Sequence, residues 1–167
     1  FFNQIFIPLH SGIFISNLLI EYDEEKGQET TVSTMTLSLL KDYVNAFIPM
    51  ISPQSNNARE AVLFIFNLIA SFNSLVISIE SKRRSGIECV KNLHISDETI
   101  EKFVEIVLPF VESSLFNATA VIQDQILDAV SLLAELSYNL TVKNLLPFCL
   151  ENMIDCEMTS TSQVCFY

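Results

Sequence analysis

The chain has no tryptophan, and only three glycines and five prolines among 167 residues. Turns are built largely from glycine and proline, and all-β domains need many turns, so this scarcity disfavours an all-β fold. The glycine loops that cradle phosphates are missing as well: the sequence contains neither G-x-x-x-x-G-K nor G-x-G-x-x-G. A helical chain without a nucleotide-binding loop is therefore favoured.

Basic residues are also scarce, with nine Lys and Arg against 20 Asp and Glu and a net charge of −11. Nucleic-acid binding requires clustered positive charge, so this balance argues against direct contact with DNA or RNA. The acidity permits a basic partner. It also keeps an apolar chain in solution, and the sequence leaves both interpretations open.

The common catalytic and metal-binding patterns are absent, since there is no H-E-x-x-H and no G-x-S-x-G. His10 and His94 are isolated and have no second ligand at helical spacing. Asp124 and Asp128 lie one helical turn apart; such a pair can share a proton or hold a cation, but is more typical of a solvated face. We expect no enzyme, no cofactor and no metal site.

Cysteine is too sparse for a disulfide framework, and no C-x-x-C pair occurs among Cys89, Cys149, Cys156 and Cys165. Two N-x-S/T triplets begin at Asn117 and Asn139, but such triplets are common by chance. We therefore expect an intracellular protein of the cytoplasm, the nucleus or both.

What the chain does have is a recurring phrase: two apolar residues, a proline and two more residues that are mostly apolar. Its four copies are residues 6–10, 47–51, 107–111 and 145–149, and their prolines lie 41, 60 and 38 residues apart. A repeating unit of about 40 residues is typical of stacked helical pairs. Each unit is predicted to be a first helix that ends in a proline bend, a turn, and a longer second helix.

The copies align beyond the proline. Residues 43–49 match 103–109 and 141–147, while 58–63 match 122–127 and 67–72 match 131–136. Residues 1–10 are predicted to be the end of an earlier helix, and a short helix is predicted at 86–93. Ser96 and Thr99 are expected to start the helix at 97. The main predicted helices are 13–22, 31–51, 58–77, 97–113, 117–137 and 141–153. We expect one domain over 1–167, with repeats at 1–30, 31–77, 97–137 and 138–155 and an insertion at 78–96.

This pattern resembles the HEAT-repeat family of α-solenoids, close kin to armadillo repeats. The Leu-Pro-Phe type of phrase carries the resemblance, together with the second helix that begins at 58–62, where Arg59 matches a basic residue often found early in a HEAT second helix. The aligned copy has Gln123 there and departs from the pattern. The resemblance implies an all-α solenoid of antiparallel helix pairs, about 3.5 repeats of a longer chain, whose faces pack on neighbouring repeats.

In HEAT solenoids the second helices usually line the concave surface. The resemblance therefore implies a partner-binding face made of Glu60, Phe64, Asn67, Ser71, Asp124, Asp128, Ser131 and Glu135. Such an acidic face suits a basic peptide, extended or helical. The expected function is a non-catalytic protein-binding scaffold, similar to the karyopherin-β nuclear transport receptors that carry basic cargo. Proteasome activators, phosphatase scaffold subunits and chromosome-organising subunits are the alternatives within the family.

The only basic cluster is Lys82, Arg83 and Arg84. It could bind an acidic peptide or a phosphate, or it could complement the dipole at a helix end. It also follows residues 61–79, an uncharged stretch of membrane-spanning length, as a cytoplasmic flank would. A protein that spans a membrane at 61–79 is the alternative of a different class. The aligned residues 125–136 carry Asp128 and Glu135 and cannot span, so a buried solenoid helix explains both copies better.

Overall fold

The computed structural model describes residues 7–22, 31–52, 55, 57–88, 92–117 and 120–163. These residues form six α-helices, one 3-10 turn and two short strands, so the all-α prediction is confirmed. The elements are α1 (Ile7–Asn17), β1 (Glu21–Tyr22), α2 (Thr31–Phe47), η1 (Ile48–Met50), α3 (Ala58–Arg84), β2 (Leu93–His94), α4 (Asp97–Asn117), α5 (Ala120–Leu136) and α6 (Tyr138–Gln163).

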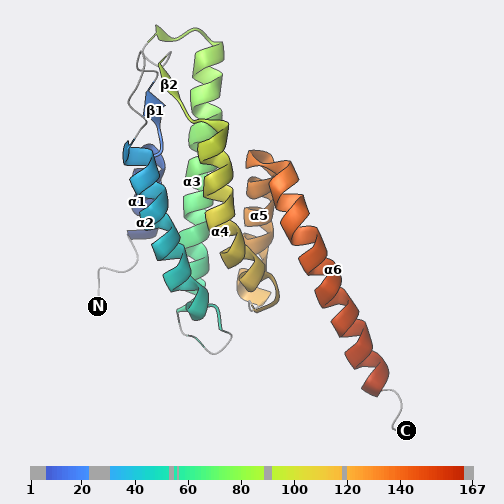
Figure 1. Ribbon diagram of the computed structural model, residues 1–167. Helices are drawn as coiled ribbons and strands as arrows, with labels where there is room; N and C mark the ends of the chain where they lie inside the picture. The colour runs from blue at the N-terminus through green and yellow to red at the C-terminus, as the bar shows by residue number, and fades with distance from the viewer. Residues whose placement is uncertain are drawn as a thin grey trace.

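The helices lie in two layers (Figure 1). In the near layer α2 contacts α4, and α4 contacts α6; in the layer behind, α1 contacts α3, and α3 contacts α5. Contacts of α5 with α4 and with α6 join the layers. Helices that alternate along the chain therefore lie side by side within each layer.

The core between the layers is built on α3. Its apolar residues Ile65, Leu68, Ile69 and Phe72 recur at helical spacing and are almost fully buried. The ring of Phe72 stacks on that of Phe103 in α4, with centroids 4.1 Å apart. The rings of Phe64 in α3 and Phe47 in α2 lie 5.1 Å apart. Two aromatic pairs thus tie α3 to the near layer.

The helices α1 and α3 approach each other closely because Gly12 has no side chain. A Cβ atom there would lie 3.2 Å from both the backbone oxygen of Asn67 and the Cα of Leu68. One turn along α1, the hydroxyl of Ser16 is buried and donates a 2.7 Å hydrogen bond to the Gly12 carbonyl, so it needs no partner from α3. The small residues on this face of α1 thereby permit backbone-to-backbone packing.

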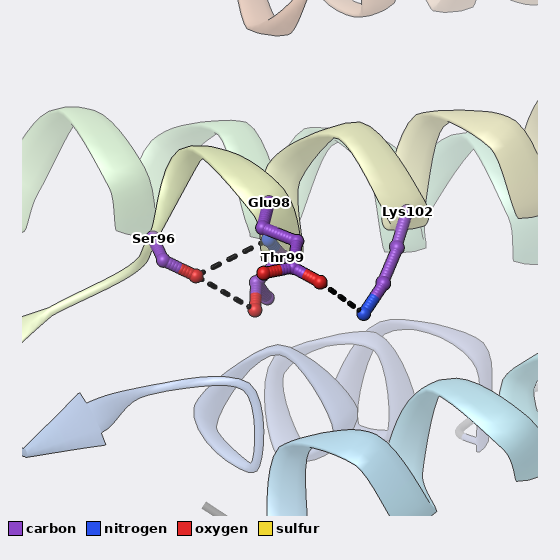
Figure 2. A network of polar contacts seen from close by, with 4 residues as sticks. All are labelled: Ser96, Glu98, Thr99 and Lys102. Atoms are coloured by element: carbon purple, nitrogen blue, oxygen red, sulfur yellow. Dashed lines mark hydrogen bonds and ion pairs between the residues drawn. The ribbon is translucent and has the colours of Figure 1, made fainter. Parts of the chain in front are cut away.

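The predicted start of α4 is confirmed (Figure 2). The Ser96 hydroxyl accepts a hydrogen bond from the Thr99 backbone N–H at 3.2 Å and donates one to Thr99 Oγ1 at 3.1 Å. Such a cap satisfies a helix N–H that has no partner within the helix. In the same turn, Lys102 Nζ lies 2.6 Å from Glu98 Oε1, and this hydrogen bond and the lysine's charge lower the pKa of Glu98.

The helix α3 begins where predicted but runs seven residues past the predicted end at 77. It ends in a Schellman motif: Gly86 has a φ of 71° and donates its N–H to the Arg83 carbonyl at 3.0 Å, while the Ile87 N–H reaches the Lys82 carbonyl at 3.3 Å.

Replacing Gly86 with alanine is expected to lower the free energy of unfolding by about 1 kcal/mol, because a Cβ atom strains the left-handed backbone. Chemical denaturation monitored by circular dichroism measures the loss. No atom lies within 4 Å of the added Cβ, so a steric clash cannot contribute. Asparagine tolerates this backbone region, so Gly86→Asn should cost less. Equal costs for the two variants would contradict this account of the turn.

The segment expected as an insertion, 78–96, is not a loop throughout. Its first seven residues extend α3, and β2 then pairs antiparallel with β1, placing His94 opposite Glu21. The prediction of a short helix at 86–93 is wrong for the residues described there, because the chain reverses at Gly86 and enters a strand whose partner is far away in the sequence.

Of the three helices α2, α4 and α6, only α2 ends beside its proline. It ends at Phe47 and Pro49 lies in η1, whereas α4 continues past Pro109 to Asn117 and α6 past Pro147 to Gln163. A proline inside a helix costs one backbone hydrogen bond. After Pro109, the side chains of Phe110 and Val111 are buried, and their burial favours continuing the helix.

Other boundaries also differ from the prediction. Residues 1–6 of the helix expected at 1–10 lie outside the described residues. From Ile7 on, one helix, α1, takes the place of the expected boundary between 1–10 and 13–22, with Pro8 in its first turn, where a missing N–H costs nothing. The helix α5 begins at Ala120 rather than at 117. The helix α6 begins at Tyr138 and reaches Gln163, beyond the predicted end at 153.

Candidate functional site

The predicted partner-binding face lies on two helices that contact each other. Four of its residues are on α3 and four on α5. The side chains of Glu60, Asp124, Asp128, Ser131 and Glu135 are exposed, whereas those of Phe64, Asn67 and Ser71 are partly buried. The structure thus places the acidic members at the surface of one layer and the remaining α3 members deeper.

Three carboxylates on this face have no side-chain partner among the described residues. Within the described part of the chain, Glu60, Asp124 and Asp128 form no hydrogen bond or ion pair with another side chain. We call these three residues the acidic face. Carboxylates without a cation nearby leave a negative surface that an incoming positive side chain can neutralise.

Glu135 is held by a contact that the sequence did not reveal. The Nδ2 atom of Asn73 in α3 donates a 2.7 Å hydrogen bond to its Oε2 atom, and Asn73 is only 5% exposed. A buried amide without a partner would destabilise the fold. Because Glu135 on α5 satisfies the amide of Asn73 on α3, the bond stabilises the contact between the two helices. The signal available in the sequence was an asparagine within an apolar helical run.

Phe64 is also less available than predicted. Its ring packs on Phe47, and the residue borders the main hydrophobic core. Asn67 lies where α1 crosses α3, with its carbonyl oxygen facing Gly12. Both residues contribute to packing between helices, which leaves the carboxylates as the chemically distinctive part of the face.

The described residues contain no group of three or more His, Cys, Asp or Glu that could hold a metal ion. A small cavity lies between α3, α4 and α5, lined by residues that include Val62, Phe110, Ser114 and Gln125. The buried Oε1 atom of Gln125 has no protein partner among the described residues, and the cavity is too small for a substrate. Elsewhere in the near layer, partial burial raises the pKa of Glu112.

The basic cluster forms the last turn of α3, and all three side chains are exposed. Arg84 Nη2 lies 2.7 Å from Glu80 Oε2, one turn earlier on the same helix. Positive charge at a helix C-terminus is stabilising, which agrees with the dipole interpretation. Binding of an acidic ligand by Lys82, Arg83 and Arg84 stays a prediction.

Cys149 is a half-buried free thiol on α6. The side chains of Cys89, Cys156 and Cys165 lie outside the described residues. The triplet at Asn117 extends into residues 118–119, which also lie outside them, and Asn139 falls in the first turn of α6.

Of the helices in the described part of the chain, α3 alone is long and apolar enough to cross a membrane. Core helices of soluble proteins pass the same test of length and composition. Eight residues of α3 are buried against the rest of the chain, and the helix contacts α1 on one side and α5 on the other. Of its apolar window, 39% is buried inside the described structure.

Comparisons of the chain with protein-family models, with curated proteins and with solved structures find no match. The function is therefore inferred from the geometry and chemistry of this chain.

Proposed function

We propose that the chain is an α-solenoid segment of the HEAT-repeat type that serves as a non-catalytic protein-binding scaffold. In this arrangement α2, α4 and α6 are first helices, and α1, α3 and α5 are second helices. Their side-by-side contacts within two layers support the assignment.

Burial at aligned positions gives further support. Val62 and Ile126 are both buried, as are Ile65 and Ala129, and Ile69 and Leu133. In the first helices, Val44 and Val104 occupy matching positions and are both fully buried. Equivalent residues in successive repeats are expected to face equivalent neighbours, so a true repeat should show this agreement.

The acidic face is the proposed binding surface, and its ligand is a basic peptide, extended or helical. The observation that carries this proposal is the exposure of Glu60, Asp124 and Asp128 without partners on two adjacent helices. Opposite charge steers association and selects the partner. At the family level this suggests a karyopherin-β-like transport receptor of the cytoplasm and nucleus; a proteasome, phosphatase or chromosome scaffold would use the same surface for another protein.

Reversing the charge of Asp124 and Asp128 tests the proposal. Fluorescence anisotropy with a labelled Lys- and Arg-rich peptide should show binding to the wild-type chain that weakens with salt. The variant Asp124→Lys/Asp128→Lys should bind at least about tenfold more weakly, because attraction becomes repulsion.

The matched control is Glu101→Lys/Glu105→Lys, which reverses an equally spaced, exposed pair on α4 in the other layer. It makes the same change in net charge and should retain most of the affinity. Unchanged binding by the α5 variant, or equal losses in both variants, would rule out the acidic face as the binding surface.

A further inference from the structure

The C-terminal end of α3 is exposed throughout its last turns. Ile79 is the last buried residue of this helix, and every residue from Glu80 to Glu88 is exposed. This end of α3 projects beyond the neighbouring ends of α4 and α5 (Figure 1). Side chains at a projecting helix end are accessible to an enzyme that modifies proteins.

Ser85 places a hydroxyl at this end of α3. It directly follows the last helical residue, its side chain is exposed, and its Oγ atom donates a 2.9 Å hydrogen bond to the Ser81 carbonyl. Gly86, with a φ of 71°, turns the chain immediately after it. The hydroxyl therefore lies at the surface beside a turn, and one short-range bond holds it to the helix.

Ser85 differs from every other serine and threonine of the chain in the residues that precede it. Lys82, Arg83 and Arg84 occupy the three positions before it. No other serine or threonine in the sequence has a lysine or arginine within three residues upstream. Protein kinases with an acidic substrate groove select cations at these positions by charge complementarity.

Two of these three cations have no competing partner. Arg84 pairs with Glu80 across one helical turn, at 2.7 Å. Lys82 and Arg83 are exposed, and within the described part of the chain they form no ion pair. The cations two and three residues before Ser85 are therefore available to the carboxylates of an acidic groove.

We propose that Ser85 is a phosphorylation site for a protein kinase that selects basic residues before the acceptor. The Ser85 Oγ atom attacks the γ-phosphorus of ATP, and the bond between that phosphorus and the leaving oxygen of ADP breaks. A carboxylate of the kinase takes the proton of the hydroxyl, so the products are phosphoserine and ADP. The inference depends neither on the acidic face nor on the repeat arrangement.

The local structure lets this segment enter a kinase. An acceptor segment binds a kinase groove in an extended form, so the last turn of α3 has to unwind first. No side chain from Glu80 to Glu88 is buried, so unwinding this end breaks a few hydrogen bonds and gives up little apolar burial. The rest of α3, from Ile79 back to Ala61, keeps its buried side chains in place.

A phosphate on Ser85 changes the end of α3 in two ways. It carries about −1.5 to −2 charges at neutral pH, and it therefore offsets much of the positive charge of Lys82, Arg83 and Arg84. It also puts negative charge at a helix C-terminus and removes the hydroxyl that bonds the Ser81 carbonyl. We expect the last turn of α3 to loosen as a result.

Phosphorylation of the whole chain in vitro tests the assignment. The reagents are Mg²⁺, ATP and a purified kinase that selects lysine or arginine two and three residues before the acceptor, and mass spectrometry of proteolytic fragments locates the phosphate. The wild-type chain should be phosphorylated on Ser85, and Ser85→Ala should not be phosphorylated at this end of α3. Ser81 is the internal control, because it is also exposed but follows Glu80 and no cation.

Removing the free cations tests their role in recognition. The variant Lys82→Gln/Arg83→Gln keeps the Ser85 hydroxyl and should be phosphorylated at least about tenfold more slowly. The matched control is Lys41→Gln/Lys143→Gln, which removes two exposed positive charges from α2 and α6 and should be phosphorylated at the wild-type rate. All substituted side chains lie at the surface, and circular dichroism checks that helicity is unchanged.

Hydrogen exchange of the phosphorylated chain tests the loosening. Amides of residues 82–87 should exchange faster than in the unmodified chain, while those around Leu68 should be unchanged.

Three outcomes would overturn the phosphorylation site: no phosphate on Ser85, transfer to Ser81 at a similar rate, or equal slowing in the two double variants. Unchanged exchange at the end of α3 after phosphorylation would overturn the predicted loosening.

Discussion

Replacing Phe103 with alanine is expected to lower the free energy of unfolding by about 3–5 kcal/mol. The ring is fully buried and stacks on Phe72 with centroids 4.1 Å apart, at a point where α4 meets α3 between the two layers. Its removal loses the burial of a large apolar surface, leaves a cavity and takes away the stacking partner of Phe72. Chemical denaturation followed by circular dichroism measures the change.

The control for this substitution lies in the chain itself. Tyr43 occupies the aligned position on α2 but is more than half exposed. The variant Tyr43→Ala should therefore change the free energy of unfolding by no more than about 0.5 kcal/mol. A similar cost at both positions would mean that the contrast in burial between α2 and α4 is not real.

Replacing Gly12 with leucine is expected to undock α1 from α3. The new Cβ atom would meet the Asn67 oxygen and the Leu68 Cα at 3.2 Å, and both are backbone atoms that cannot rotate away. Overpacking of this kind costs about 1–3 kcal/mol and occasionally more, while the better helix propensity of leucine returns less than about 1 kcal/mol.

Hydrogen exchange measured by mass spectrometry should locate the effect. Amides of α1 should exchange faster in Gly12→Leu, together with those of α3 around Leu68, while α5 and α6 change little. The control is Phe14→Ala, which truncates a largely exposed side chain of the same helix and should leave the exchange pattern unchanged. Uniformly faster exchange throughout the chain would contradict local undocking.

The features that the sequence predicted correctly depend on neighbours along the chain. The all-α fold is indicated by the scarcity of turn residues, and the start of α4 by the hydroxyl of Ser96. Each of these signals acts within one or two helical turns. Local chemistry decides such features, so a single sequence suffices to find them.

The errors arose where distant segments meet. The helix α4 continues past Pro109 to Asn117, four residues beyond the predicted end at 113, and the burial of Phe110 and Val111 outweighs one lost hydrogen bond. No local signal in the sequence reveals that Leu93 pairs with Tyr22, so β2 is missing from the predicted elements. Tertiary packing overrode the local preference in the first case and supplied a missing partner in the second.

The candidate site divides in the same way. Helical spacing alone placed Asp124 and Asp128 on one face, and both are exposed. The bond between Asn73 and Glu135 joins residues 62 positions apart, and no periodicity could reveal it. The positions of Asp124 and Asp128 could therefore be predicted from the sequence, whereas the contacts of Glu135 and Phe64 with other helices could not.

The short ladder between β1 and β2 affects how the molecule assembles. Units that touch only their neighbours can form in any order and can melt one at a time from the ends. Pairing of Tyr22 with Leu93 instead closes a ring of chain that contains α2 and α3. Closing so long a ring costs conformational entropy before the contacts within it can form, so the ladder should form late in folding. Once formed, it links the unfolding of α2 to that of α3, because both helices lie within the closed ring.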